Sequence, residues 1–254
     1  MTDVVLGTRD LTVEFGGVRA LHRVSLTCLR GQLTGLIGPN GAGKTTFVDA
    51  VTGFLSGNAS GTVELEGINV LGRPPHQLAR QGLTRTWQSL ELFDDLTVRA
   101  NLEIASGNPA LSRVVTEFFG RRRPDTRVDE VLELLDLQDV ADRKPRELSH
   151  GKRKLVGVAR ALSAHKTKVL LLDEPAAGLD RPETLWFGGQ LRRLIDLGYT
   201  MMLIDHDMTL VLSVCDHIIT LVYGEAIASG SPTEIRNDAK VISAYLGKSA
   251  EGHR

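Results

Sequence analysis

The residues best suited to chemistry in this chain form a glycine-rich loop, Gly38-Pro39-Asn40-Gly41-Ala42-Gly43-Lys44-Thr45. The loop follows a short apolar run, Leu33 to Ile37, and precedes a predicted helix, Thr46 to Phe54, as the pattern GxxxxGK[ST] requires. Glycines let successive backbone N–H groups curl around phosphate oxygens, and the helix directs the positive end of its dipole at the same anion. The nucleotide-binding residues predicted here are Asn40, Gly41, Gly43, Lys44, Thr45 and Thr46.

Four side chains are predicted to divide the chemistry of this site. Lys44 supplies a mobile positive charge for the β- and γ-phosphates, and the Thr45 hydroxyl can bind Mg²⁺. A second apolar run, Val169 to Leu172, is followed directly by Asp173 and Glu174. Carboxylates at the end of such a strand face the crevice where ligands collect. Asp173 suits the water shell of Mg²⁺, and Glu174 suits a general base that polarises the attacking water.

The elements that must position these residues alternate as in an α/β protein with a parallel sheet. The N-terminal stretch, Val4 to Leu29, is β-rich, and Thr62 to Glu66 alternates with period two, as in a half-exposed strand. From Thr97 to Leu148 the pattern becomes helical. Further helices are predicted behind Gly151, from Glu183 to Leu197 and from Ala239 to Leu246, and further strands over Val169–Leu172, Met201–Ile204 and a last β pair around Ile218–Ile227.

The predicted helices carry apolar stripes at helical spacing. The core-facing residues expected on them are Val128, Val131, Leu132 and Leu135, then Leu155, Val158, Ala159 and Leu162, then Trp186, Leu191, Leu194 and Ile195. The run Arg121 to Arg123 is predicted to be a solvated loop rather than a contact with lipid head groups or a partner.

Composition limits the classes of function. The 254 residues carry 30 basic and 31 acidic side chains, so a net charge of -1 gives no overall electrostatic case for binding nucleic acid. Two cysteines far apart in sequence, Cys28 and Cys215, favour a reducing, cytosolic compartment. The N-terminus lacks the pattern of a signal peptide, and no apolar run approaches the ~20 residues of a membrane span. Any membrane role is therefore expected to come from docking onto another chain.

Five further features resemble the motifs of ATP-binding-cassette (ABC) ATPases in order and spacing, over nearly the whole chain. Leu148-Ser149-His150-Gly151-Lys152 resembles the LSGGQ signature, Gln88 the Q-loop glutamine, Ala177-Gly178-Leu179-Asp180 the D-loop, His206 the switch histidine and Phe15 the adenine-stacking aromatic. The resemblance implies that Gln88 and His206 join Lys44 and Glu174 in catalysis, that Gln88 also senses Mg²⁺, and that Phe15, Ser149, Gly151 and Asp180 contact ATP.

The same resemblance implies a fold and its division. It implies an α/β P-loop NTPase (RecA-like) core with an N-terminal antiparallel β subdomain and an inserted α-helical subdomain, all within one domain of residues 1–254. The ATP-binding core with its β subdomain is expected over 1–88 and 165–254, and the mainly helical part with the signature over 89–164.

Ser149 precedes the helix that begins near Gly151, so its hydroxyl and the N–H groups that follow form a second anion site as well as a helix cap. Two anion sites separated by a long insertion suggest two chains placed head to tail, with ATP between the loop of one and the signature of the other. The signature departs from its family because His150 replaces a glycine and Lys152 replaces a glutamine. A cation there opposes the helix dipole by about 0.3–1 kcal/mol.

One phosphate loop, one signature and a short insertion favour the separate ATPase subunit of a transporter. Several segments resemble the ATPases of branched-chain amino-acid importers (the LivG-like group). They are Val13–Val18, Arg85–Gln88, Leu92–Val98, Glu174–Leu179 and the ending Tyr245–Gly247. The resemblance implies ATP and Mg²⁺ as cofactors, and a peripheral location at the cytoplasmic face of the membrane.

The partners it implies are transmembrane permease subunits, a second ABC ATPase subunit (identical or a paralogue) and, indirectly, a solute-binding protein, with no nucleic acid. An importer for urea or short amides, which Leu148–Gly151 also resembles, and a soluble ABC ATPase outside transport remain alternatives, as does a scaffold that binds nucleotide without hydrolysing it. The presence of both Glu174 and His206 argues against the scaffold.

Overall fold

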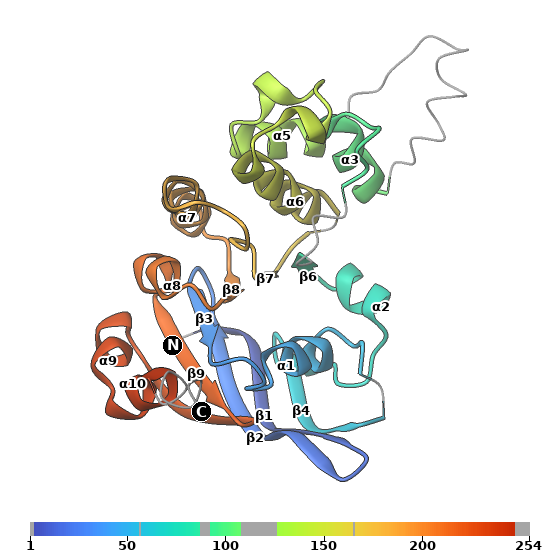
Figure 1. Cartoon of the computed structure of the whole chain (residues 1–254). Helices are drawn as coiled ribbons and strands as arrows, with labels where there is room; N and C mark the ends of the chain where they lie inside the picture. Colours follow the sequence, from blue (N-terminus) through green and yellow to red (C-terminus); the bar gives the residue numbers. More distant parts are fainter. Residues whose placement is uncertain (1–2, 56, 87–91, 108–125, 165, 247–254) are drawn as a thin grey trace.

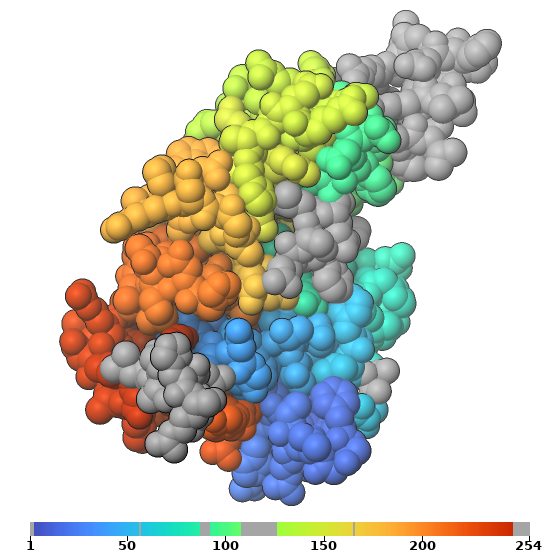
Figure 2. All heavy atoms as spheres, viewed as in Figure 1, coloured from blue at the N-terminus to red at the C-terminus, as the bar shows by residue number. Residues whose placement is uncertain are grey.

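The computed structural model describes residues 3–55, 57–86, 92–107, 126–164 and 166–246. They form two β-sheets and a set of helices, with α3, α5 and α6 grouped at one end of the molecule and the β1–β2 hairpin at the other (Figure 1). Figure 2 shows the same separation in space-filling form, with the blue N-terminal strands far from the green and yellow helices. The α/β class predicted from the alternation of elements is confirmed.

The first sheet is antiparallel and has the strand order β2-β1-β4-β5. Its strands are β1 (Val4–Phe15), β2 (Val18–Leu29), β4 (Ala59–Leu65) and β5 (Ile68–Asn69). Alternate residues of β2 are buried from Val24 to Cys28, as expected for a sheet with one face on the core. The predicted β-rich N-terminal part is therefore confirmed.

The second sheet has the strand order β10-β9-β3-β8-β7-β6, and only β10 runs antiparallel to its neighbour. Its strands are β3 (Leu33–Ile37), β6 (Leu83–Thr86), β7 (Val169–Asp173), β8 (Met201–Ile204), β9 (His217–Val222) and β10 (Glu225–Gly230). Every residue of β3, β7 and β8 is buried. Such continuous burial is typical of a parallel sheet covered on both faces.

The two faces of this sheet pack against different layers. Leu170 and Leu172 of β7 belong to a core shared with α6 (His150–Ala164), α7 (Arg181–Asp196) and α8 (Met208–Val214). Leu171, which points to the other face, belongs to a core shared with α1 (Lys44–Val51) and the antiparallel sheet. The alternation of side chains along one strand thus joins the two layers.

The remaining helices complete the fold. Between β6 and β7 lie α3 (Val98–Ala105), α5 (Thr126–Leu134), η1 (Gln138–Val140), η2 (Pro145–Glu147) and α6; elsewhere lie α2 (Pro75–Arg80), α9 (Pro232–Asn237) and α10 (Ala239–Leu246). Val128, Val131, Leu132 and Leu135 are buried, which confirms the stripe expected on α5. None of the helices in the described part is long and apolar enough to cross a membrane. The division at residues 88/89 and 164/165 stays a prediction.

The prediction that Trp186 faces the core is wrong. Trp186 is 39% exposed, whereas its neighbour Phe187 is fully buried together with Leu191 and Leu194. Neighbouring residues on an α-helix are about 100° apart, so only one of the two aromatics can point into the core. Trp186 instead lies over the start of α6, where a Cβ on Gly151 would be 3.4 Å from its ring.

Both cysteines are buried and free. Burial raises the pKa of the Cys28 thiol to about 12 and also raises the pKa of Cys215. Cys28 lies on β2 and Cys215 directly follows α8, so the two thiols belong to different layers of the fold.

The orientation of α7 about its own axis can be tested by shortening two of its side chains, one buried and one exposed. Phe187→Ala should lower the free energy of unfolding by about 3–5 kcal/mol because it removes a fully buried ring and leaves a cavity. Leu185→Ala, at a side chain that is 52% exposed, should change it by less than about 0.5 kcal/mol. Urea unfolding followed by circular dichroism measures both. Equal costs for the two variants would contradict the orientation of α7.

Candidate nucleotide site

The parallel strands end level with one another at one edge of the second sheet. Asp173 at the end of β7 pairs with Ile204 of β8, and Ile204 pairs with Leu36 of β3. Thr86 of β6 pairs with Leu172 of β7. The phosphate loop, Asp173-Glu174 and Asp205-His206 therefore all leave the sheet at its carboxyl edge, where ligands bind in open α/β sheets.

The phosphate loop is shaped by backbone conformations that exclude larger residues. Gly43 caps α1 with a φ of 103°, and a Cβ at this position would lie 2.7 Å from the Ala20 carbonyl oxygen. Lys44, the first residue of α1, is buried, and its ammonium group donates to the carbonyl oxygens of Gly38 at 2.6 Å and Pro39 at 3.1 Å. The charge of Lys44 is therefore held against the loop by two of the loop's own carbonyl groups.

Most of the predicted nucleotide contacts line one hollow with a volume of about 450 Å³. Its lining includes every residue from Asn40 to Thr46, together with Glu174. Four further lining residues were not predicted: Val18, Arg19, Ala20 and Tyr223. The structure thus places the proposed general base in the same hollow as the phosphate loop, although the two lie more than 120 positions apart in sequence.

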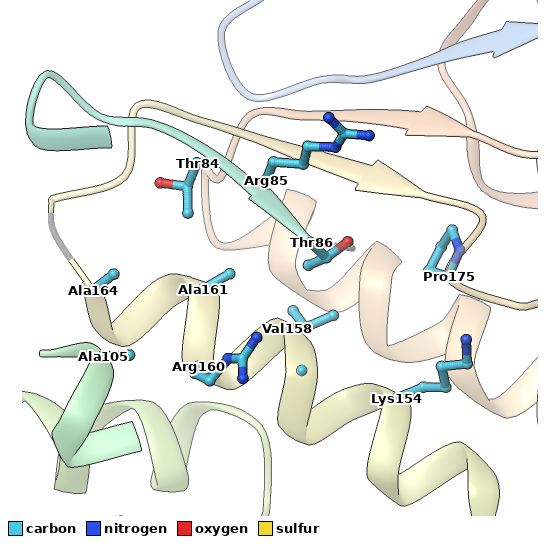
Figure 3. A pocket seen from close by; sticks show the side chains of 11 residues that line it. Thr84, Arg85, Thr86, Ala105, Lys154, Val158, Arg160, Ala161, Ala164 and Pro175 are labelled. Atoms are coloured by element: carbon cyan, nitrogen blue, oxygen red, sulfur yellow. The ribbon is translucent and has the colours of Figure 1, made fainter. Parts of the chain in front are cut away.

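Arg85 of β6 connects its strand to α1 and β7 through two carboxylates. Its guanidinium group donates to Asp173 Oδ2 at 2.7 Å and to Asp49 Oδ1, on α1, at 2.6 Å. The Arg85 and Asp173 side chains are only 8% and 9% exposed. Figure 3 shows Arg85 extending from β6 on the side away from α6. The predicted Mg²⁺ carboxylate is thereby fixed in orientation through one of its two oxygens.

Glu174 occupies a strained backbone conformation. Its φ of 44° is left-handed, and its N–H donates to the Ile204 carbonyl oxygen at 2.7 Å, which fixes the turn after β7. His206 Nδ1 lies 3.8 Å from Glu174 Oε1, so the predicted base and the predicted switch histidine are neighbours. A left-handed residue between strand and helix turns the carboxylate out of the sheet and into the hollow.

Buried charges surround this pair. Asp205 is 1% exposed and its Oδ1 accepts the N–H groups of His206 at 2.7 Å and Asp207 at 2.9 Å, while burial raises its pKa. Burial lowers the pKa of Lys154 on α6, and the charges of Asp205 and Glu174 oppose that shift. Lys154, which Figure 3 shows on α6, therefore contributes positive charge near the two carboxylates.

The signature residues surround the start of α6. Ser149 Oγ accepts the Lys152 N–H at 3.3 Å, as a helix cap does, and the Ser149 side chain is exposed. The Gly151 N–H donates to Glu183 Oε1 at 3.1 Å. The Lys152 ammonium lies 3.1 Å from Asp139 Oδ2. Lys152, which replaces the usual glutamine of the signature, therefore has an acidic partner.

The D-loop lies beside the signature. Asp180 caps α7 by accepting the Glu183 N–H at 2.8 Å. A Cβ on Gly178 would lie 3.0 Å from the His150 ring. His150, which stands where the signature usually has a glycine, thus packs against the Ala177–Asp180 segment.

Of the described residues predicted to act at the phosphate-loop site of one chain, Phe15, Asp173 and His206 are not among those that line the hollow. Phe15 is 40% exposed at the end of β1, paired with Val18, which does line the hollow. Gln88 lies outside the described residues, as do Arg121 to Arg123, so predictions for them stay predictions.

Arg85, Glu183 and Tyr223 were not predicted as site residues from the sequence. Arg85 and Asp173 are 88 positions apart and Gly151 and Glu183 are 32 apart, so no local pattern joins either pair. Arg85 belongs to the segment Arg85–Gln88, which resembles the importer ATPases, but that resemblance predicted no role for it. The signal for Tyr223 was equally weak, because one tyrosine before a glycine marks a turn and no more.

Comparison with known proteins identifies the family to which this chain belongs. Residues 21–177, more than half of the chain, match the family model described as ABC transporter. The chain belongs to the ABC transporter family. Residues 227–251 also match the model described as branched-chain amino acid ATP-binding cassette transporter. This cassette is therefore an ATPase of that family, which confirms the resemblance stated from the motifs.

Individual relatives cover the whole cassette. It is 36% identical, over 98% of its length and 100% of the relative, to BraF of Pseudomonas aeruginosa, a high-affinity branched-chain amino acid transport ATP-binding protein. Identity and coverage are the same for LivG of Salmonella typhimurium. A solved ATP-binding cassette in its ADP conformation superposes with a TM-score of 0.83 at 32% identity, covering 96% of this chain and 99% of that one. As a transporter ATPase, the cassette works with transmembrane permease components.

The pairing of Arg85 with Asp173 yields a stability prediction. Arg85→Met should lower the free energy of unfolding by about 3–5 kcal/mol, because it leaves a buried carboxylate without its cation. Adding Asp173→Asn should recover part of that loss, since it removes the charge left behind. Arg99→Met is the matched control: its partner Asp129 is 45% exposed, so the cost should stay below about 1 kcal/mol. Additive effects of the Arg85 and Asp173 variants in denaturant titrations would contradict the coupling.

Proposed function

We propose that this cassette is the ATP-hydrolysing subunit of an ABC importer for branched-chain or other hydrophobic amino acids. The observation that carries the substrate class is the match of residues 227–251 to the branched-chain amino acid transporter model. In the structure, this segment contains most of β10 and both α9 and α10. The named relatives, BraF and LivG, support the same class.

We assign the nucleotide to the hollow beside α1. The N–H groups of the loop from Asn40 to Thr46 bind its phosphates, Lys44 neutralises the β- and γ-oxygens, and Phe15 stacks on the adenine. The oxygen donors of Thr45 and Asp173 fit the preference of Mg²⁺ for hard ligands, with Gln88 as a further contact. When bound there, Mg²⁺ neutralises charge that develops on the phosphates during hydrolysis.

Glu174 acts as the general base in this proposal. Its carboxylate lines the hollow and, turned outward by the left-handed backbone, polarises a water for in-line attack on the γ-phosphorus. His206, 3.8 Å from Glu174, lies where its imidazole can orient that water or contact the γ-phosphate. Attack forms the new P–O bond as the bond to the β-phosphate oxygen breaks, and the water's proton passes to Glu174.

A second cassette completes the site. Two chains placed head to tail bring Ser149 and Gly151 of each opposite the phosphate loop of the other, and Asp180 to the same interface. Ser149 accepts a hydrogen bond in its capping role and keeps its own hydroxyl hydrogen to donate to the γ-phosphate. The Gly151 N–H must exchange Glu183 for the phosphate, so closure replaces one anion by another at this helix end.

The contacts to the γ-phosphate suffice to drive closure in this scheme. Two charge-assisted hydrogen bonds per site at ~1.5–3 kcal/mol each give at most about 6–12 kcal/mol over two sites. Moving an equilibrium from 1:99 to 99:1 needs about 5.5 kcal/mol. Because Gly151 gives up its bond to Glu183, the net gain lies toward the lower end. Loss of the γ-phosphate then reopens the dimer.

The partner assignments follow from this scheme. The cassette associates peripherally with the cytoplasmic face of the membrane through permease subunits, and the segment from Gln88 to Val98 receives a short permease helix. A solute-binding protein acts indirectly, through the permease. The second cassette is either an identical chain or a paralogue.

Glu174→Gln tests both the base and the composite site. The variant should bind ATP normally, lose at least about 100-fold in turnover, since a general base contributes 10²–10⁴-fold, and accumulate as an ATP-bound dimer. Adding Ser149→Trp should abolish that dimer while leaving ATP binding to the single chain intact. Light scattering for mass and calorimetry for binding separate the two effects. Near-normal turnover of Glu174→Gln would remove Glu174 from its role, and a persistent dimer in the double variant would contradict the head-to-tail arrangement.

The substrate class needs the intact transporter. The tagged cassette should co-purify with permease subunits from solubilised membranes. In vesicles, ATP hydrolysis by that complex should rise when binding protein loaded with leucine, isoleucine or valine is added. Stimulation by urea or short amides alone would favour that importer class instead. Full ATPase activity in a cassette that never co-purifies with membrane proteins would favour a role outside transport.

A further inference from the structure

The hollow beside α1 extends beyond the residues that can hold phosphate. Val18, Arg19 and Ala20 of β2, together with Tyr223, line it without belonging to the phosphate loop. The loop N–H groups and Lys44 take the phosphates in the proposed function, and Glu174 takes the attacking water. The remaining four lining residues have no part in binding the phosphates or the attacking water, so they are available to the nucleoside.

Tyr223 is held in place by its neighbour. It forms the turn between β9 and β10 with Gly224, whose N–H donates to the Ala42 carbonyl oxygen at 2.9 Å. The His22 N–H donates to the Gly224 carbonyl oxygen at 2.8 Å. Gly224 has a φ of 79°, and a Cβ there would lie 2.6 Å from the Ala20 carbonyl oxygen. The turn is thus fixed against both the phosphate loop and β2.

The folded chain buries little of the Tyr223 side chain. It is 82% exposed, more than any other large apolar side chain in the described part of the chain. Its φ of 49° is left-handed, a conformation that suits glycine or asparagine better than tyrosine. A large ring that is exposed, unfavourable for its backbone and fixed at the wall of a ligand hollow indicates a contact that forms only with ligand.

We propose that Tyr223 is a nucleotide-contacting residue whose ring packs against the nucleoside of ATP. This inference rests on the proposed function, because it needs the phosphates in the loop beside α1. It adds a contact from the β9–β10 turn of the parallel sheet to the contact proposed for Phe15 from the antiparallel sheet. Two aromatic side chains from separate sheets then contact one nucleoside, and neither ring contacts the phosphates.

Inorganic tripolyphosphate distinguishes a contact to the nucleoside from damage to the phosphate loop. Tyr223→Asn removes the ring and suits the left-handed turn, so its melting temperature should equal or exceed that of the parent chain. Its Kd for ATP should rise about five- to tenfold, as expected for loss of one stacking contact, while its Kd for tripolyphosphate stays within about twofold. Tyr223→Phe keeps the ring and should retain most of the affinity for ATP. Calorimetry on the full chain with both ligands measures each value.

Two results would overturn the proposal: an unchanged Kd for ATP in Tyr223→Asn, or equal weakening of ATP and tripolyphosphate. Lys44→Ala separates this outcome from failure of the nucleotide site itself. That variant should lose affinity for both ligands, because it removes the charge that binds phosphate. If Lys44→Ala binds both as the parent does, the phosphate-loop assignment and the Tyr223 contact are overturned together.

Discussion

The parallel pairing of β3, β8, β7 and β6 is the constraint on which the site depends. The four strands are short, and their register brings the ends of all of them to one edge. Phosphate loop, carboxylate pair and His206 are scattered over nearly 170 positions of sequence, yet each simply follows the end of a strand. A slip of one residue in β7 would turn Asp173 to the opposite face of the sheet and separate it from Arg85.

Buried and partly buried charged groups lie near this edge of the sheet. Arg85 joins Asp49 and Asp173, while Lys154 lies near Asp205 and Glu174. Buried ion pairs of this kind rarely make a protein more stable than an apolar core would. Removing one member of the pair is nevertheless strongly destabilising, because the other charge stays buried without a partner. They fix where each carboxylate points, and they tie α1, β6, β7 and α6 to the same few side chains. A movement of α6 relative to the sheet would change the charge around Glu174 directly.

Sequence reasoning succeeded where one local requirement determines structure. Neighbouring residues alone were enough to predict three features: the glycine-rich loop, the apolar run before Asp173 and the stripe from Val128 to Leu135. It failed for α2, β6, α8 and α9, which have four to seven residues and show too little periodicity to be recognised. Trp186 shows a subtler limit: its helix was predicted, but the direction of one aromatic depended on tertiary packing. The partners of Arg85 and Gly151 came only with the fold, because pairing across 88 or 32 positions leaves no mark in local sequence.

The burial of both native thiols has a practical consequence for work on this protein. With Cys28 and Cys215 kept protonated and away from solvent, maleimides and other alkylating reagents have almost no background target in the folded chain. One cysteine introduced at the surface can then carry a fluorophore or a spin label whose signal comes from a single known position. With a second introduced cysteine, distances between the helices α3, α5 and α6 and the β1–β2 hairpin, or between two cassettes, become measurable without first removing the natural residues.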